Sequence, residues 1–186
     1  MSKIFCLGLH KTGTSSLGRA LEFLGYKNCY GATHLRRQIG ESKLMQALFS
    51  KQYEPLIDFA ENYDAFNDLP WSVLYEALDD HFPDSKFILT TREDDAWLVS
   101  AKRYFGDTSS PFRLWMYGKP SPKGNEAVYL KKYKAHNEKV LHYFSDRDCL
   151  LVLDVDQQNK WRALCNFLDK PVPALDYPHL NEKGRR

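Results

Sequence analysis

A glycine-rich segment at residues 8–16, GLHKTGTSS, lies between a short apolar run and a helical pattern. Residues 4–9 are apolar over the length of a strand, and from Thr14 onward Leu and Ala recur at helical spacing until Gly25. A strand that turns tightly into a helix brings backbone N–H groups together at the helix N-terminus, which carries about half a positive charge. The segment therefore predicts an anion-binding loop within a strand–loop–helix unit.

The side chains of this loop are also suited to a phosphate group. Gly8 and Gly13 allow close approach of the backbone, and Lys11 adds a full positive charge. An ordinary strand-to-helix turn needs one hydroxyl as a helix cap, whereas this loop has four hydroxyl side chains and a lysine. The predicted phosphate-binding residues are His10, Lys11, Thr12, Gly13, Thr14, Ser15 and Ser16.

The position of the lysine distinguishes this loop from those of ATPases and kinases. In the pattern G-x-x-x-x-G-K-[ST] the lysine follows the second glycine. Here Gly8 and Gly13 have that spacing, but Thr14 stands at the lysine position. Lys11 lies two residues before Gly13, where we expect its ammonium beside the bridging oxygen of a transferred group. In that pattern the Ser or Thr that binds Mg²⁺ directly follows the lysine. No lysine follows Gly13 here, so we expect no metal ion.

Two further apolar segments of strand length, residues 86–91 (KFILTT) and 149–155 (CLLVLDV), are each followed by a helical pattern. Apolar strands that alternate with helices indicate a mainly parallel sheet that is covered on both faces. We therefore predict an α/β fold, a three-layer α/β/α arrangement with a central, mainly parallel sheet.

The rest of the chain adds helices and one segment of irregular composition. Residues 107–125 are rich in Pro, Gly and Ser with interleaved aromatic residues, and we predict a loop or lid there. No linker marks a domain boundary, so a single domain over residues 1–186 is expected. Helical patterns cover residues 35–49, 55–61, 71–81 and 126–144, and residues 64–68 indicate a further short strand.

Composition argues against some classes of partner. Lys and Arg number 26 against 24 acidic residues, and this net charge of +2 gives no reason to expect nucleic acid. No apolar run approaches the roughly 18 residues of a membrane span, and the N-terminal run is too short for a secretion signal. The four cysteines form no C-x-x-C pair and three lie in apolar stretches, so buried thiols of a cytoplasmic protein are expected. Nothing in the sequence indicates an oligomeric state.

The motif KTGTSSL resembles the 5′-phosphosulfate loop of sulfotransferases that use 3′-phosphoadenosine 5′-phosphosulfate (PAPS), and its KTGT form is similar to that of heparan sulfate sulfotransferases. Nearly the whole chain resembles the small bacterial-type P-loop sulfotransferases. The matching segments are GLHKTGTSSL near the start, DLPW at 68–71, FPDSKFILTTRE at 82–93 with Trp97 and Ser100, and WRALCNFLDKPVP with YPHLN within 161–181.

This resemblance implies a fold of the P-loop nucleoside triphosphate hydrolase type and a defined reaction. PAPS is the implied donor and 3′-phosphoadenosine 5′-phosphate (PAP) the product, without a metal ion. The implied acceptor is a hydroxyl or amine of a small molecule or glycan. The alternatives are a P-loop kinase of nucleotides or small molecules and a non-catalytic nucleotide-binding protein.

The resemblance also implies that Arg92 and Ser100 hold the 3′-phosphate of the donor. Arg92 follows the strand at residues 86–91, and a guanidinium at the carboxyl end of a parallel strand points into the crevice where such sheets bind ligands. Ser100 lies about two helical turns later, with Arg103 one turn further along the same side. The alternative is a surface pairing of Arg92 with a carboxylate of residues 93–95. The basic residues Lys183, Arg185 and Arg186 are a looser candidate for the same phosphate, or a solvated terminus.

Sulfuryl transfer needs a group that stabilises charge on the leaving phosphate and a base for the acceptor's proton. Lys11 is the candidate for the first role. Asp68 is the candidate base, although it is also placed to cap a helix near Pro70. His10 and His34 are the other candidates for the base. The predicted acceptor pocket draws on the aromatic residues Trp71, Tyr104, Phe105, Phe112, Trp115 and Tyr117.

Overall fold

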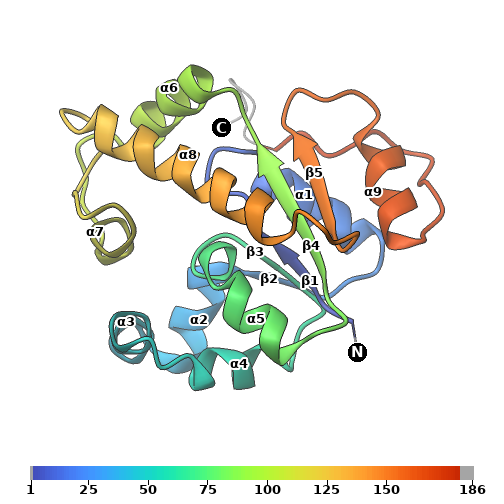
Figure 1. Cartoon of the computed structure of the whole chain (residues 1–186), viewed down its shortest axis with the longest axis horizontal. Helices are drawn as coiled ribbons and strands as arrows, with labels where there is room; N and C mark the ends of the chain where they lie inside the picture. Colours follow the sequence, from blue (N-terminus) through green and yellow to red (C-terminus); the bar gives the residue numbers. More distant parts are fainter. Residues whose placement is uncertain (1, 181–186) are drawn as a thin grey trace.

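The fold is built on one parallel sheet (Figure 1). The computed structural model describes residues 2–180, and in this part of the chain five strands lie in the order β2-β3-β1-β4-β5. Phe5 in the central strand pairs with Phe66 on one side and Phe87 on the other, so the register places apolar residues next to one another. The strands are β1 (Ile4–Cys6), β2 (Asn28–Tyr30), β3 (Ala65–Asn67), β4 (Lys86–Thr91) and β5 (Leu150–Asp154).

Helices cover both faces of the sheet. Within the described residues they are α1 (Thr14–Phe23), α2 (Gly31–Ile39), α3 (Glu41–Ser50), α4 (Glu54–Ala60), the 3-10 turn η1 (Trp71–Val73), α5 (Tyr75–His81), α6 (Asp94–Phe105), α7 (Pro111–Tyr117), α8 (Glu126–Tyr143) and α9 (Lys160–Leu168). Figure 1 shows α1 and α9 on one side of the strands and α5 and α8 on the other.

Alternation of side chains along β1 explains the three layers. Ile4 and Cys6 belong to the core under α1 and α9, whereas Phe5 and Leu7 belong to the core under α2 to α5 and α8. All four are almost completely buried. Burial of a side chain of this size contributes about 1.5–3 kcal/mol, so a strand with two apolar faces holds both helical layers against the sheet. The predicted three-layer α/β/α arrangement with a parallel sheet is confirmed.

The elements differ most from the predicted ones at four places. The helix predicted over residues 71–81 is the 3-10 turn η1 followed by α5. The helix predicted over residues 35–49 is two helices, α2 and α3, because Gly40 has a φ of 82° and interrupts the helical backbone. The predicted loop at residues 107–125 contains α7, which begins with the cap Ser110 and Pro111 and ends at Gly118 in the left-handed region. Strand β2 was not predicted, since its three residues are too few for a recognisable pattern.

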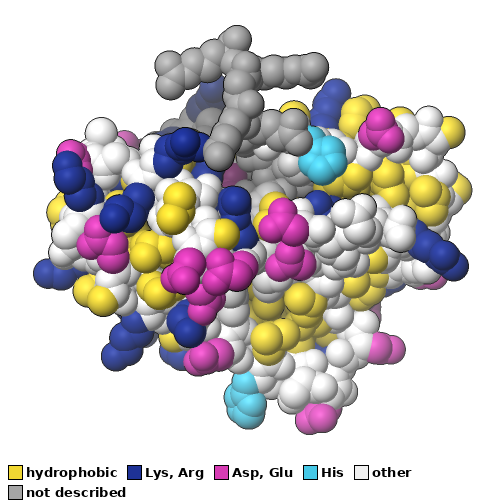
Figure 2. Space-filling view, turned by 90° about the horizontal axis from the view of Figure 1, so that it is seen from above, with side chains coloured by type: hydrophobic (Ala, Val, Ile, Leu, Met, Phe, Trp, Pro, Cys, Tyr) yellow, Lys and Arg dark blue, Asp and Glu magenta, His cyan; other side chains and the backbone are white. Residues whose placement is uncertain are grey.

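Two features of composition can be compared with the structure. Cys6, Cys29 and Cys165 are buried as free thiols, as predicted, whereas Cys149 is only partly buried. Within residues 2–180, no helix has both the length and the apolar character needed to cross a membrane. Basic and acidic side chains are intermixed on the face of the molecule that Figure 2 shows, in keeping with the small net charge.

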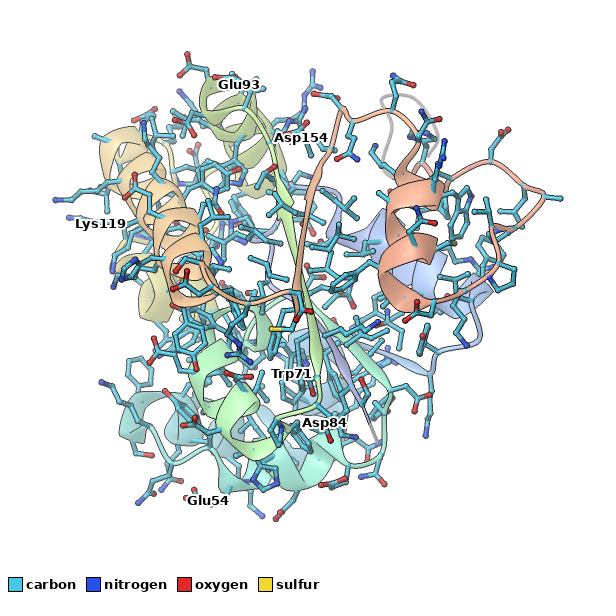
Figure 3. The ribbon with its side chains drawn as sticks, turned by 45° about the vertical axis from the view of Figure 1, so that its right-hand side comes forward. Glu54, Trp71, Asp84, Glu93, Lys119 and Asp154 are labelled. Atoms are coloured by element: carbon cyan, nitrogen blue, oxygen red, sulfur yellow. The ribbon has the colours of Figure 1, made fainter. Side chains whose placement is uncertain are left out.

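Parallel strands bring the residues that follow them to one edge of the sheet. In Figure 3 the labelled Glu93 and Asp154, which lie where β4 and β5 end, are at one end of the molecule, and Asp84 is at the other. The loop after β1, Asp68 after β3 and Arg92 after β4 therefore come together although they are far apart in the sequence.

Candidate functional site

A cavity of about 2180 Å³ lies at this carboxyl edge. Among its wall residues are the predicted donor-binding residues and the candidate base Asp68: His10, Lys11, Thr12, Gly13, Thr14, Ser15, Ser16, Asp68, Arg92 and Ser100. His34 is not a wall residue, because its ring lies on α2 with Nδ1 accepting a hydrogen bond from the backbone N–H of Tyr30 at 3.3 Å. The fold thus brings these ten residues together at one cavity, and His34 lies apart from them.

Tight packing against β4 fixes the path of the glycine-rich loop. A Cβ atom at Gly8 would lie 1.8 Å from Oγ1 of Thr90, so only glycine fits there. The Thr12 hydroxyl donates to the carbonyl of Leu9 at 2.6 Å and is 2.6 Å from the Thr90 hydroxyl. Thr12 is 1% exposed. Its hydroxyl therefore holds the loop together, and its contribution to a ligand would come from the backbone.

The N-terminus of α1 is left open towards the cavity. Its N-cap residue Gly13 has a φ of 91° and no side chain with which to cap the helix, and the first turn contains no acidic residue. Uncapped N–H groups at a helix N-terminus attract an anion. Ser15 and Ser16 lie beside them on the cavity wall, and Oγ of Ser16 also accepts a hydrogen bond from the backbone N–H of Leu180 at 3.0 Å.

Lys11 brings a positive charge to the same place. Its backbone has a φ of 71°, and its Nζ lies 4.2 Å from the centre of the Tyr104 ring, a cation–π contact with α6. Burial lowers the pKa of Lys11, the charge of Arg92 lowers it further, and the charge of Asp68 opposes both effects. Lys11 and Arg92 are neighbouring cations that repel each other, and a bound anion would lower the electrostatic energy of both.

Arg92 lies next to the loop, and within residues 2–180 its guanidinium forms no salt bridge with a carboxylate. Its Nη1 donates to the carbonyl of Lys11 at 3.3 Å, and its Nε is buried with no hydrogen-bond partner in the described part of the chain. Two of the three carboxylates at residues 93–95 are engaged elsewhere. Glu93 accepts hydrogen bonds from the first N–H groups of α6, and Asp94 pairs with Lys134 at 2.9 Å. The guanidinium thus faces the cavity with unused donors, together with Ser100.

Asp68 faces the loop from the end of β3. Its Oδ1 accepts a hydrogen bond from the Thr14 hydroxyl at 2.7 Å, and its backbone has a φ of 67°. Burial raises the pKa of Asp68, while the Thr14 hydrogen bond and the Lys11 charge lower it. The alternative role as a helix cap is not seen, because the N-cap of η1 is Pro70 and no side-chain hydrogen bond caps that turn. The carboxylate is instead directed to the loop.

The His10 side chain packs among aromatic residues next to the loop. Its ring lies among those of Trp97, Phe105 and Tyr117, and Nε2 is 2.7 Å from the Tyr117 hydroxyl. Burial, together with nearby positive charge, lowers the pKa of His10 to about 3. A ring so enclosed is poorly placed to take a proton from a ligand, which leaves Asp68 as the better candidate base.

Comparison with known protein families decides the family. A family model described as a sulfotransferase domain matches residues 3–122 and 112–186. The chain belongs to this sulfotransferase domain family. The resemblance that was based on the loop and the later motifs is thereby confirmed.

Individual proteins are also similar to this chain. The sulfotransferase-domain chain is 28% identical to the Ava biosynthesis cluster protein M of Aspergillus versicolor, over 96% of this chain and 80% of that protein. Among solved structures it is similar to shikimate kinase from Bacteroides thetaiotaomicron, with a TM-score of 0.53 and 13% identity over 90% of this chain and 95% of that chain. At this identity the likeness concerns the fold alone, and it agrees with the predicted P-loop nucleoside triphosphate hydrolase-like fold.

The aromatic residues predicted for an acceptor pocket in this sulfotransferase domain are only partly on the cavity wall. Tyr104, Phe105 and Phe112 are wall residues. Trp71 is completely buried in the core against Phe66, and neither Trp115 nor Tyr117 lines the cavity, since Tyr117 contacts His10 instead. Aromatic residues in a helical pattern more often pack in a core than face a ligand, which explains the difference.

Sequence reasoning missed one side of the cavity. The loop after β5, the start of α9 and the segment before Leu180 supply wall residues such as Val155, Lys160 and Tyr177. They come near the glycine-rich loop only through the fold, and the contact of Leu180 with Ser16 spans 164 positions. The predicted basic residues Lys183, Arg185 and Arg186 lie outside the described residues.

His136 supports the loop from α8 and makes stability depend on pH. It is buried, and its Nε2–H donates to the carbonyl of Leu7, just before the loop, at 2.7 Å. Burial lowers the pKa of His136 from 6.5 to about 4. Between these pH values the unfolded chain binds a proton that the folded chain does not, so stability falls as the pH decreases through this window.

We therefore expect the pH dependence of unfolding to change in His136→Gln. Between pH 7 and pH 5 the wild-type free energy of unfolding should fall by about 2 kcal/mol more than that of the variant, because His136 protonates only in the unfolded chain. Urea unfolding at the two pH values measures this difference. His142→Gln, an exposed histidine on the same helix, is the matched control. Equal pH dependence of wild type and His136→Gln would contradict the expectation.

Proposed function

We propose that this chain transfers a sulfuryl group from PAPS to a hydroxyl or amine of a small-molecule or glycan acceptor. The observation that carries the proposal is the presence of two anion anchors on one cavity. The first is the open N-terminus of α1 with Lys11, and the second is Arg92 with Ser100. A nucleotide with anionic groups at both its 5′ and 3′ positions matches two such anchors.

The residues present fit this donor. The loop offers uncapped N–H groups, half-buried serine hydroxyls and a lysine, which suit a phosphosulfate. Arg92 has a buried Nε without a partner among the described residues, and a phosphate would supply acceptors for its guanidinium. No group of three or more His, Cys, Asp or Glu side chains suited to a metal is found within residues 2–180.

Each residue then has a definite role. When bound, the donor supplies a sulfuryl group whose leaving group is a phosphate. Lys11 and the N-terminus of α1 would stabilise the negative charge that develops on that phosphate. Asp68 would accept the proton of the acceptor, and Thr14, through its 2.7 Å hydrogen bond, orients the carboxylate. Tyr104, Phe105 and Phe112 would contact the acceptor from the cavity wall.

Ligand-dependent thermal stability tests the donor. We expect PAP to raise the melting temperature in the presence of EDTA, and at a hundredfold excess over Kd the ligand should contribute about 2.7 kcal/mol to stability. ATP with Mg²⁺ is the comparison ligand. Stabilisation by ATP with Mg²⁺ but not by PAP would contradict the proposal and favour a kinase.

A transfer assay tests catalysis separately from binding. The protein is incubated with sulfur-labelled PAPS and a panel of phenols, alcohols, amines and saccharides, and labelled products are counted. Binding of PAP without transfer to any of these acceptors would favour a non-catalytic nucleotide-binding protein.

A further inference from the structure

A stacked pair of aromatic residues lies behind the two anion anchors. The rings of Trp97 on α6 and Tyr133 on α8 are parallel within 5°, with their centres 4.2 Å apart. Both side chains are completely buried, so they do not contact a ligand in the cavity. Their polar atoms, however, point outwards from the stack to the backbone of the two anchors.

Tyr133 holds the backbone at Arg92. Its hydroxyl donates to the carbonyl of Arg92 at 2.7 Å and accepts from the backbone N–H of the same residue at 2.9 Å. One hydroxyl therefore satisfies both polar backbone groups at the turn where β4 ends and the guanidinium leaves the sheet. A backbone held at both groups has little freedom to rotate, which fixes the origin of the Arg92 side chain.

Trp97 holds the glycine-rich loop. Its Nε1–H donates to the carbonyl of His10 at 2.9 Å, directly before Lys11. The stack thus joins the loop, through Trp97, to the Arg92 turn, through Tyr133. The hydrogen bond from Nη1 of Arg92 to the carbonyl of Lys11 joins the same two segments on the cavity side.

We propose that Trp97 and Tyr133 are positioning residues that fix the spacing of the two anion anchors, and so determine the preference for a nucleotide phosphorylated at both the 3′ and the 5′ positions. This inference rests on the proposed function. When the two anchors are fixed, a ligand already bound to one can contact the other at little additional entropic cost, and its affinity increases. This increase in affinity is lost when the anchors move independently. A ligand that uses only the loop does not depend on their spacing.

Tyr133→Phe tests the inference, because it keeps the ring in the stack and removes only the hydroxyl. Isothermal titration calorimetry gives Kd for PAP and for adenosine 5′-phosphate, which lacks the 3′-phosphate. We expect the ratio of Kd for adenosine 5′-phosphate to Kd for PAP to fall by about tenfold, comparable with the loss of one hydrogen bond between Arg92 and the 3′-phosphate. The affinity for adenosine 5′-phosphate should change less than twofold. Trp97→Phe, which removes the N–H donor to His10, should shift the ratio in the same direction and serves if Tyr133→Phe does not fold.

Tyr129→Phe is the matched control. Tyr129 lies one turn earlier on α8, its ring stacks on that of Tyr117, and its hydroxyl donates to the carbonyl of Lys119 at 3.1 Å. Tyr129→Phe also removes a hydrogen bond from a buried tyrosine hydroxyl to a backbone carbonyl, but this bond does not reach Arg92, so the ratio should stay within twofold of wild type. In an Arg92→Ala background, Tyr133→Phe should no longer change the affinity for PAP, because the positioned guanidinium is gone.

The outcomes separate the inference from the proposed function. An unchanged ratio in Tyr133→Phe, an equal loss for both ligands, or an effect that persists in the Arg92→Ala background would overturn the positioning role while PAP binding by the wild type stands. If the wild-type chain does not bind PAP more tightly than adenosine 5′-phosphate, the assignment of the donor fails and the inference fails with it.

Discussion

Lys11→Ala should lower kcat by about 10²- to 10³-fold, the loss that follows removal of one preorganised group that stabilises transition-state charge. Lys11 supplies the one fully charged side chain within the glycine-rich loop. Its ammonium lies over the Tyr104 ring, and the charges of Arg92 and Asp68 act on it. Its charge would stabilise the transition state more than the bound substrates, because negative charge moves onto the leaving phosphate during the transfer. The measurement is kcat with both substrates saturating.

Lys27→Ala is a suitable control for this variant. The Nζ of Lys27 also lies over an aromatic ring, that of Tyr63 at 4.7 Å, but Lys27 is not part of the cavity wall. Loss of a cation–π contact alone should leave kcat unchanged. A kcat of Lys11→Ala within threefold of wild type would refute the proposed role of the lysine, whatever its effect on PAP affinity.

The loop and its neighbours were predictable because their signals are local or follow from parallel-sheet geometry. Gly13 and the residues after it specify a helix start, and an arginine after an apolar strand must emerge at the carboxyl edge. Asp68 was predicted at the same edge for the same reason, and the structure adds its contact with Thr14. None of these inferences needed long-range packing.

The supporting residues could not be predicted in the same way. Tyr133 and His136 lie on α8, 41 and 129 positions from the backbone groups that they bind. In the sequence they are only an aromatic residue and a histidine within a helical pattern, a common arrangement in any core. Their partners are backbone atoms, which carry no residue-specific signal. The fold was needed to show that α8 reaches both the backbone of Arg92 and the carbonyl of Leu7, just before the loop.

Asp68→Asn should lower kcat by about 10²- to 10⁴-fold, as expected for removal of a general base. Asparagine retains an oxygen that can accept the Thr14 hydrogen bond, so the loop contact is preserved while the basic group is lost. Burial raises the pKa of Asp68, and a base works only when ionised. Wild-type kcat should therefore fall as the pH decreases through a value above the ordinary aspartate pKa of 3.8, and this limb should be absent in the variant.

Folding stability distinguishes a catalytic loss from a structural one. A carboxyl group whose pKa is raised by folding destabilises the folded chain once it ionises, so Asp68→Asn should be at least as stable as wild type at pH 7. Asp64→Asn is the control, since Asp64 lies before β3 as Asp68 lies after it and accepts one hydrogen bond, from the backbone N–H of Lys27 at 2.9 Å. Its kcat should not change. Two outcomes would contradict this role: a slow Asp68→Asn variant that is also unstable, or one that keeps the wild-type pH profile. In either case another group takes the proton, and the Asp68 carboxylate is a structural partner of Thr14.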